Sequence, residues 1–440
     1  MCKWVRVIGM LMVVMMVPIH AMATNGDNLI GVGPISRGMG GVGIASPQDA
    51  ISAVFSNPAA MCFGAFCPSN QVDFAGTAFM PNIHASIKGG VSPLGPFGPA
   101  PFANRAHSDP RVFPIPALGI SYSFPEYPSW RFGFGAYGVT GLGVDYRGTS
   151  LDQPNFFGPG APLAAGAFSN LQIMKFAPTA AYQINHWLSL GASFNISYST
   201  VDLRNGSNSG FAPGAQIGAI IKPHKNVSIG LSYTTPQDVN HHNVLTGAPT
   251  FPGGPATLHS LALSSPNNLG VGLGWEAIPR KLLFEADFKW LNWANADGYR
   301  HFDWSDQYVF NIGAQYKPIP KLALRMGYNY GNNPVKGHKN FVGFNPANPA
   351  QPPMTTIQGT PIPTYFFETF RTLGFPAIVE HHITAGIGYD VSERFAINVG
   401  FMYAFENSIT ATGTNLAGQP TSIKSSLSET GVDLGLSWRF

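Results

Sequence analysis

The sequence has 440 residues and a formal net charge of +3, and 11% of its residues are charged while 12% are aromatic. Ordinary globular domains have about 25% charged residues, so this composition argues against an ordinary soluble domain. The small net charge gives a nucleic-acid partner no electrostatic support. After residue 23 the sequence has no run of about 18 apolar residues, so we expect no transmembrane helix. Few charges, many aromatic residues, 51 glycines and 38 prolines together favour a transmembrane β-barrel.

Residues 1–23 are typical of a secretory signal peptide. Lys3 and Arg6 form a basic start, Val7–Val17 is an apolar stretch, and residues 21–23 read A-M-A, which fits a cleavage site. We therefore expect the rest of the chain to be exported.

Residues 24–70 precede the first expected strand and contain the stretch "GMGGVG" at 38–43. Its glycines have the G-x-G-x-x-G spacing of a dinucleotide-binding loop. Such a loop needs a preceding strand and an acidic residue about 20 positions further on. No strand precedes Gly38, and no acid lies between Asp49 and Asp73. We therefore expect neither a nucleotide nor any other cofactor.

Residues 24–70 are instead predicted to form a hatch that plugs the lumen of the barrel. Glycines allow an irregular backbone to approach the barrel wall closely; the hatch glycines are Gly38, Gly40, Gly41 and Gly43. A short helix is expected after Ser46-Pro47 and is expected to end at Asn57, because the residue before a proline avoids the α region. Asn57, Pro58 and Ala59 form an N-P-A motif, in which Asn57 caps or anchors the hatch in either a structural or a gating role.

Two cysteines, Cys62 and Cys67, remain after the signal peptide. Outside the cytoplasm they are predicted to form a disulfide, worth about 2 kcal/mol because the loop that it closes is small. No His, Asp or Glu lies between them, so we do not predict a metal site. The pairs His241-His242 and His381-His382 do not predict one either, since adjacent strand residues point to opposite faces.

The remaining residues, 71–440, alternate in the manner of membrane-spanning strands. In "LLFEADFKW", Phe284, Ala286 and Phe288 alternate with Glu285 and Asp287. A soluble sandwich also alternates, but here the second face is rich in Gly, Ala, Ser and Asn, and the aromatic residues lie near the strand ends, as in a lipid-facing girdle. We predict fourteen antiparallel strands, at 71–80, 113–124, 130–146, 171–184, 187–203, 211–222, 226–235, 256–276, 282–292, 306–317, 321–331, 379–390, 394–406 and 423–440.

Short links such as "KPIPK" alternate with long ones such as 81–112 and 332–378. This is the outer-membrane arrangement, with the short turns in the periplasm. The last strand ends at Phe440, like the C-terminal assembly signal of bacterial outer-membrane proteins.

The stretch "SRGMGGVGIASPQDAISAVFSNPAAM" (36–61) resembles the N-terminal hatch of the FadL/TodX-type outer-membrane transporters of hydrophobic compounds. The later stretches 265–294, 310–335 and 381–405 are similar too, so the resemblance covers nearly the whole exported chain. It implies a monomeric fourteen-stranded barrel in the outer membrane of a Gram-negative bacterium, surrounded by membrane lipid and plugged by its own N-terminus. It also implies that extracellular loops capture the ligand, that the hatch moves, and that the ligand leaves sideways through the wall.

Two apolar loops are candidates for ligand capture, although they could equally pack on each other as a lid. Their residues are Phe156, Phe157, Leu163 and Phe168 in the first loop and Phe366, Phe367 and Phe370 in the second. Gly138 and Gly141 lie in the glycine-rich third strand, where a kink would form the lateral gap; the alternative is that they only make room for the hatch.

The predicted activity is passive transport of a hydrophobic small molecule, and the resemblance favours long-chain fatty acids over aromatic or aliphatic hydrocarbons. Arg325 and Lys317 are candidate partners for a fatty-acid carboxylate. An open porin is disfavoured by the hatch, and a lipid hydrolase by the lack of a G-x-S-x-G motif or a placed Ser–His pair. We therefore do not expect an enzyme.

Overall fold

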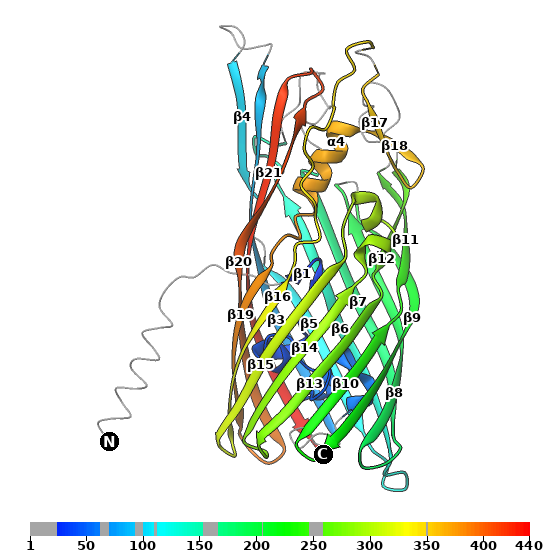
Figure 1. Ribbon diagram of the computed structural model, residues 1–440, viewed down its shortest axis with the longest axis vertical. Coiled ribbons are helices and arrows are strands. Elements are labelled where there is room, and N and C mark those ends of the chain that lie inside the picture. Colours follow the sequence, from blue (N-terminus) through cyan, green and yellow to red (C-terminus); the bar gives the residue numbers. More distant parts are fainter. Residues whose placement is uncertain are drawn as a thin grey trace, which may run out of the picture.

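The computed structural model describes residues 24–61, 70–92, 100–109, 112–152, 166–204, 206–245, 258–348 and 351–440 (Figure 1). Antiparallel strands form a closed barrel, with short turns at one end and long loops at the other. Among the residues described, no helix is long and apolar enough to cross a membrane.

The barrel has the fourteen antiparallel strands that the alternation predicts. They are β3 (Gln71–Ser92), β5 (Phe113–Tyr122), β6 (Trp130–Asp145), β7 (Phe168–Gln183), β8 (Leu188–Asp202), β9 (Asn208–His224), β10 (Val227–Thr234), β13 (Asn268–Ile278), β14 (Leu282–Leu291), β15 (Gln307–Ile319), β16 (Leu322–Gly331), β19 (His381–Asp390), β20 (Phe395–Thr414) and β21 (Pro420–Arg439).

The barrel closes between β21 and β3, which pair from Arg439↔Gln71 to Ser422↔Lys88 without a shift in register. This pairing satisfies the backbone groups of both strands at the level of the membrane, where unpaired backbone groups are costly. Alternation sets the two faces: Phe284 is 40% exposed to the outside, whereas Glu285 and Asp287 on the same strand are 2% and 4% exposed in the lumen.

Two predictions about the long loops were wrong. The predicted strand 256–276 is two elements: β12 (Leu258–Ser265) pairs with β11 (Gln237–Leu245) in a separate hairpin, and β13 begins only at Asn268. The expected loop 81–112 is largely strand, because β3 continues to Ser92 and pairs with β4 (Ala100–His107). Together with β20 and β21, this hairpin extends the sheet beyond the barrel on the long-loop side (Figure 1).

Smaller elements complete the long-loop end. They are η2 (Trp293–Asn295), η3 (Tyr299–Phe302), β17 (Met354–Ile357), β18 (Thr360–Pro363), α4 (Thr364–Thr369) and the π-helical turn η4 (Phe370–Gly374).

Residues 24–61, which we call the luminal segment, lie inside the barrel (Figure 1). Their elements are β1 (Thr24–Asn25), β2 (Asn28–Leu29), α2 (Gly33–Gly38), α3 (Ala50–Ser56) and η1 (Pro58–Ala60). Asp49 caps α3 by accepting a hydrogen bond from the Ser52 N–H, so the helix begins three residues later than the sequence suggests, and it ends at Asn57 as expected.

Candidate functional site

The luminal segment is anchored to β14 by two buried carboxylates. The Asp287 carboxylate accepts hydrogen bonds from the N–H groups of Gly43 (3.0 Å) and Ile44 (3.2 Å). The Glu285 carboxylate accepts them from the N–H groups of Ala45 (2.8 Å) and Ser46 (2.9 Å). Four consecutive backbone donors of an irregular segment thus find acceptors on one strand, which satisfies groups that would otherwise be buried without partners.

A buried ion pair holds the segment on the opposite wall. Arg37, which is fully buried, donates to the Asp433 carboxylate at 2.6 Å and to the Thr77 hydroxyl at 2.8 Å. Its other nitrogens donate to the Gly31 carbonyl, so the same side chain shapes the segment and fixes it to β21 and β3.

Glycines of the wall allow the segment to approach this closely. A Cβ added to Gly327 would lie 2.2 Å from the Gly40 nitrogen, and one added to Gly313 would lie 2.3 Å from the Met39 carbonyl oxygen. At Gly230 the Cβ would lie 2.0 Å from the Ile44 carbonyl oxygen. At these glycines the backbone of the luminal segment therefore contacts the backbone of the wall directly, and there is no space for a methyl group.

The predicted hatch glycines all lie in this contact zone. Gly40 and Gly41 have φ values of 75° and 83°, which favour glycine, and the Gly40 N–H donates to the Thr384 hydroxyl of β19 at 2.8 Å. Gly38 packs against the backbone of Gly386, also on β19. Gly43 belongs to the carboxylate anchor described above.

Asn57 connects three parts of the molecule. Its amide donates to the carbonyls of Ile44 (2.8 Å) and Ala219 (3.2 Å), and its side-chain oxygen accepts from the Ala59 N–H at 3.0 Å. Pro58 and Ala59 pack against the backbone of Gly191 on β8. The N-P-A motif therefore anchors the end of the luminal segment, and whether it also gates transport stays a prediction.

A cavity of about 80 Å³ lies between the luminal segment and the wall, large enough for several water molecules. Ile44, Phe55 and Tyr137 line its apolar side, while Lys175 and Asn195 are among its polar residues. Among the described residues, the Lys175 ammonium has no hydrogen-bonded or ion-paired partner, and the acid whose charge acts on it is Asp27.

The wall is interrupted beside this cavity, at the glycines predicted to form a lateral gap. The ladder between β5 and β6 runs from Tyr122↔Phe132 to Ala117↔Tyr137 and goes no further. Immediately beyond it, β6 has a bulge between Gly138 and Thr140, and Thr140 pairs with Asn28 of the luminal segment instead.

The side chain of Ile115 fills the space beside the bulge. A Cβ on Gly138 would lie 2.5 Å from it and one on Gly141 would lie 3.8 Å away. Lys175 is the cross-strand neighbour of Tyr137, so the amine lies next to the interruption.

Aromatic side chains of two long loops form a buried cluster. Phe302 packs against Phe367, Phe370 and Phe375, with ring centroids 6.4, 5.5 and 6.2 Å away. Phe366 is also buried. The predicted capture residues of 364–375 therefore pack against the loop of Phe302 in a buried cluster, which we call the lid, and are not an exposed patch. Whether they capture a ligand stays a prediction.

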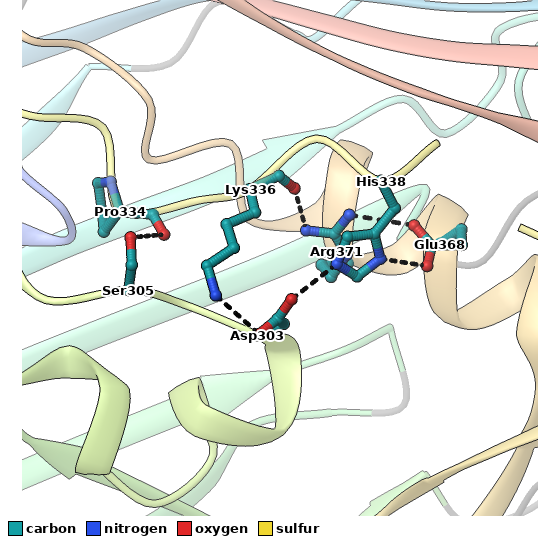
Figure 2. Close-up of polar contacts among 7 residues, drawn as sticks. All are labelled: Asp303, Ser305, Pro334, Lys336, His338, Glu368 and Arg371. Carbon is teal, nitrogen blue, oxygen red and sulfur yellow. Dashed lines mark hydrogen bonds and ion pairs between the residues drawn. The ribbon is translucent and has the colours of Figure 1, made fainter. Parts of the chain in front are cut away.

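An ionic network ties this lid to two other loop segments (Figure 2). His338 contacts the carboxylates of both Glu368 (2.7 Å, through Nδ1) and Asp303 (2.8 Å, through Nε2). Arg371 donates to Glu368 at 3.1 Å and to the Lys336 carbonyl, and Lys336 pairs with Asp303 at 3.1 Å.

The two carboxylates set the protonation state of His338. The hydrogen bond with Glu368 raises the pKa of His338 above its usual 6.5; partial burial opposes this shift, and the bond with Asp303 adds to it. Burial alone would raise the pKa of Asp303, but its hydrogen bonds with His338 and Lys336 lower it below its usual 3.8. The geometry thus favours an imidazolium held between two carboxylates.

The loop that carries Asp303 also contacts the luminal segment. The Tyr299 hydroxyl donates to the Asp27 carboxylate, and a Cβ on Gly26 would lie 2.9 Å from the Trp293 ring. Trp293, Tyr299 and Trp304 pack together in tilted and edge-to-face contacts, with ring centroids 4.6 to 5.2 Å apart. A continuous chain of contacts therefore joins the lid to the start of the luminal segment.

The described residues do not include Phe156, Phe157, Leu163, Cys62, Cys67 or the expected signal peptide. Phe168 is buried at the start of β7, with the Arg147 guanidinium 4.1 Å from its ring centroid.

The two cations suggested for a ligand carboxylate, Arg325 and Lys317, line a different cavity at the short-turn end. Arg325 is occupied there by hydrogen bonds to Gln315 (2.6 Å) and Asn398 (3.0 Å).

Sequence reasoning missed Lys175, Ile115 and the aromatic loop 293–304. The density of aromatic residues in "NWANADGYRHFDW" was an available signal, since solvated loops are rarely so apolar.

Comparisons with known proteins agree with this geometry. A sequence profile of the outer membrane protein transport protein family (OMPP1/FadL/TodX) matches residues 28–342. No curated protein matches the chain significantly by sequence.

Several solved structures have the same fold. The toluene transporter TodX of Pseudomonas putida is 18% identical with a TM-score of 0.61, over 95% of this chain and 100% of that one. The toluene transporter TbuX of Ralstonia pickettii is 17% identical (TM-score 0.58; 94% and 99% covered), and a FadL homologue of Pseudomonas aeruginosa is 14% identical (TM-score 0.59; 96% and 100% covered).

The family profile spans well over half of the chain, and the barrel matches the family's solved structures in strand number and closure. The chain therefore belongs to the OMPP1/FadL/TodX family of outer-membrane transport proteins of Gram-negative bacteria.

Proposed function

We propose that this protein carries long-chain fatty acids down their gradient across the outer membrane, with the luminal segment as a movable hatch. Transport of hydrophobic compounds across this membrane is the general activity of the family. The observation that favours a fatty acid is Lys175, an amine without a hydrogen-bonded or ion-paired partner in the described part of the chain, which lines a cavity of mixed polar and apolar character. A hydrocarbon needs no cation, whereas a carboxylate with an acyl chain suits both the amine and the apolar side of this cavity, formed by Ile44, Phe55 and Tyr137.

The path begins at the aromatic lid. An acyl chain that inserts between Phe302, Phe367 and Phe370 separates rings that now contact each other. Because the loop of Phe302 also carries Tyr299, which is bonded to Asp27, displacement of this loop pulls on the start of the luminal segment. Ligand arrival and hatch movement are thereby coupled through contacts, as coupling between sites requires.

The exit proceeds sideways into the membrane. Beyond Tyr137 the described part of β6 has no ladder to β5, so a shift of the Ile115 side chain opens the wall without breaking backbone hydrogen bonds between these strands. The Lys175 amine holds the carboxylate beside this point while the acyl chain moves outward into lipid. The segment 24–70, the N-P-A motif and the pair Gly138 and Gly141 serve this path as the hatch, its anchor and the gap.

Ligand titration of the purified protein tests the substrate, with tryptophan fluorescence as the readout and a detergent that leaves the cavity free. Wild-type protein is expected to bind oleate saturably. The Lys175→Met variant is expected to bind it about 10- to 100-fold more weakly, because a hydrogen bond to a charged group contributes about 1.5–3 kcal/mol.

Lys317→Met is the matched control, since it removes a lysine from the cavity at the short-turn end, and its oleate affinity should be unchanged. Saturable binding of toluene without binding of oleate would overturn the fatty-acid assignment. It would instead place the protein with the hydrocarbon transporters, as the names of TodX and TbuX suggest.

A further inference from the structure

The four-stranded extension above the barrel has one face buried and one face open. Side chains alternate along β3. Ile83, Ala85 and Ile87 are buried, whereas His84 and Lys88 are exposed. On β21 the same alternation buries Ile423 and exposes Lys424.

The open face continues the lipid-facing surface of the barrel. Side chains of one parity stay on one face of a strand unless a bulge intervenes. The pairing of β3 with β21 has no register shift along its whole length. The exposed Phe74 on β3 and Leu434 on β21 therefore share a face with Lys88 and Lys424.

This open face carries a compact group of cations. Ser86 is the Cα partner of Arg105 on β4 and of Lys424 on β21, and Lys88 lies two residues further along β3. Neighbouring strands are about 4.8 Å apart, so Arg105 and Lys424 flank Ser86 within about 10 Å of each other.

Hydroxyls and imidazoles surround the cations. The open-face positions of the four strands in these rows, which we call the basic face, are His84, Ser86, Lys88, Arg105, His107, Thr410, Thr412, Ser408, Ser422, Lys424 and Ser426. Acidic residues are absent from this set, and the nearest acid along β4 is Asp109, two residues beyond His107.

Within the described residues, the side chains of Lys88, Arg105 and Lys424 make no hydrogen bond or ion pair with the protein. This distinguishes them from Arg147, Arg204 and Lys336, the loop cations that pair with acids of the same chain. Three unpaired cations close together repel one another, and an external anion relieves this repulsion.

The height of the basic face indicates the kind of anion. Along β3 the open face is apolar up to Met80, and Ser86 lies six residues further on. At about 3.4 Å per residue and a tilt of about 45°, Ser86 lies about 14 Å above Met80. The polar layer of an ordinary bilayer is only about 5–8 Å thick on each side, so a head group of several phosphorylated sugars reaches the basic face better than a glycerophospholipid does.

We propose that the basic face of Lys88, Arg105 and Lys424 binds the phosphorylated sugar head group of an outer-leaflet glycolipid. Lysine and arginine hold the phosphates, and the Ser and Thr hydroxyls bond to phosphate and sugar oxygens. The acyl chains of the same molecule lie against the apolar band that ends at Met80 and Val432. This site is separate from the transport path and does not depend on the transported substrate.

The test titrates full-length protein in mild detergent with deep-rough lipopolysaccharide and counts bound lipid by native mass spectrometry. The triple variant Lys88→Gln, Arg105→Gln and Lys424→Gln is expected to bind it about 100-fold more weakly, because each cation near an anionic lipid surface contributes roughly fivefold. The control triple variant, Lys225→Gln, Lys281→Gln and Lys321→Gln, removes three exposed cations from the short-turn end and should bind like wild type.

Dephosphorylated lipopolysaccharide and phosphatidylglycerol are each expected to bind at least tenfold more weakly than the phosphorylated glycolipid. Equal binding of the first would overturn the role of the phosphates, and equal binding of the second would overturn the role of the sugars. Displacement of the glycolipid by 10 mM inorganic phosphate would show a site for free phosphate and would also refute the proposal.

If the triple variant does not fold, a salt titration of the wild-type protein decides the matter. Binding that weakens steeply between about 50 mM and 500 mM NaCl supports charge recognition, and binding that is independent of salt contradicts it.

Discussion

Replacing Gly327 by alanine tests whether the luminal segment closes the barrel through backbone-to-wall contact. The added Cβ would lie 2.2 Å from the Gly40 nitrogen and 2.2 Å from the Met39 carbonyl carbon. Both atoms belong to backbone, so no side-chain rotation relieves the overlap.

The size of the disturbance follows from these distances. Ordinary contact begins at 3.4 Å, so the segment must retreat by about 1.2 Å or the strand must bend. Overpacking of this kind costs about 1–3 kcal/mol. The retreat also lengthens the 2.8 Å hydrogen bond from the Gly40 N–H to Thr384. The closed state is therefore expected to lose about 5- to 150-fold in population relative to states with the segment displaced.

Conductance in planar bilayers measures this population. We expect brief openings that are at least fivefold more frequent in Gly327→Ala than in wild type. Gly76→Ala is the matched control, because a Cβ on this barrel glycine meets no atom within 4 Å and should leave conductance unchanged. Equal opening frequencies for Gly327→Ala and wild type would refute the packing argument, provided that both variants keep the electrophoretic mobility of a folded barrel.

Three further predictions concern the anchors and the lid. Asp287→Ala leaves the Gly43 and Ile44 N–H groups unpaired, at a cost of about 1–3 kcal/mol each. Faster proteolysis of the luminal segment is therefore expected, and a wild-type cleavage rate would contradict the role of Asp287 as an anchor. Because the pKa of His338 is raised, its ionic contribution is complete below the unfolded value of 6.5 and is lost as pH rises through the folded value. Amide exchange of residues 364–375, corrected for intrinsic rate, should therefore increase above neutral pH in wild type but not in His338→Asn, and a flat wild-type profile would argue against the network. Arg371→Met leaves the buried Glu368 without its arginine partner, and the lid is expected to exchange faster at every pH; unchanged exchange would show that the ion pair does not hold it.

The barrel was predictable because its signal is local. Phe284 and Glu285 face lipid and lumen because adjacent strand residues point to opposite faces, and a one-residue slip would put Glu285 and Asp287 into lipid. The length of β3 was not predictable from the same signal. Beyond Met80 the strand continues above the apolar band to Ser92, where the apolar–polar contrast that marks a membrane strand is no longer required.

The contacts between the luminal segment and the wall could not be predicted from the sequence, because the contacting residues are separated by hundreds of positions. Glu285 and Asp287 were expected to face inward, but their acceptance of four N–H groups at 43–46 depends on how an irregular segment folds in the lumen. Lys175 was overlooked because a lysine in a strand has the same sequence signature whether it pairs with an acid or lines a cavity. The apolar character of residues 364–375 was predicted from the sequence. Their packing against Phe302 was not, because Phe302 lies in another loop.

The central claim is that the luminal segment must move before a ligand can pass, and a reversible cross-link tests it most directly. The hydroxyls of Ser46 and Ser228 lie 2.7 Å apart, so cysteines at both positions can form a disulfide between the segment and β10. The test uses a protein with Cys62 and Cys67 replaced by serine and measures oleate uptake by cells that lack another fatty-acid transporter. We predict that uptake falls to background in the oxidised double variant, returns on reduction, and is unaffected in the Ser46→Cys single variant. Wild-type uptake by the fully cross-linked protein would contradict a moving hatch.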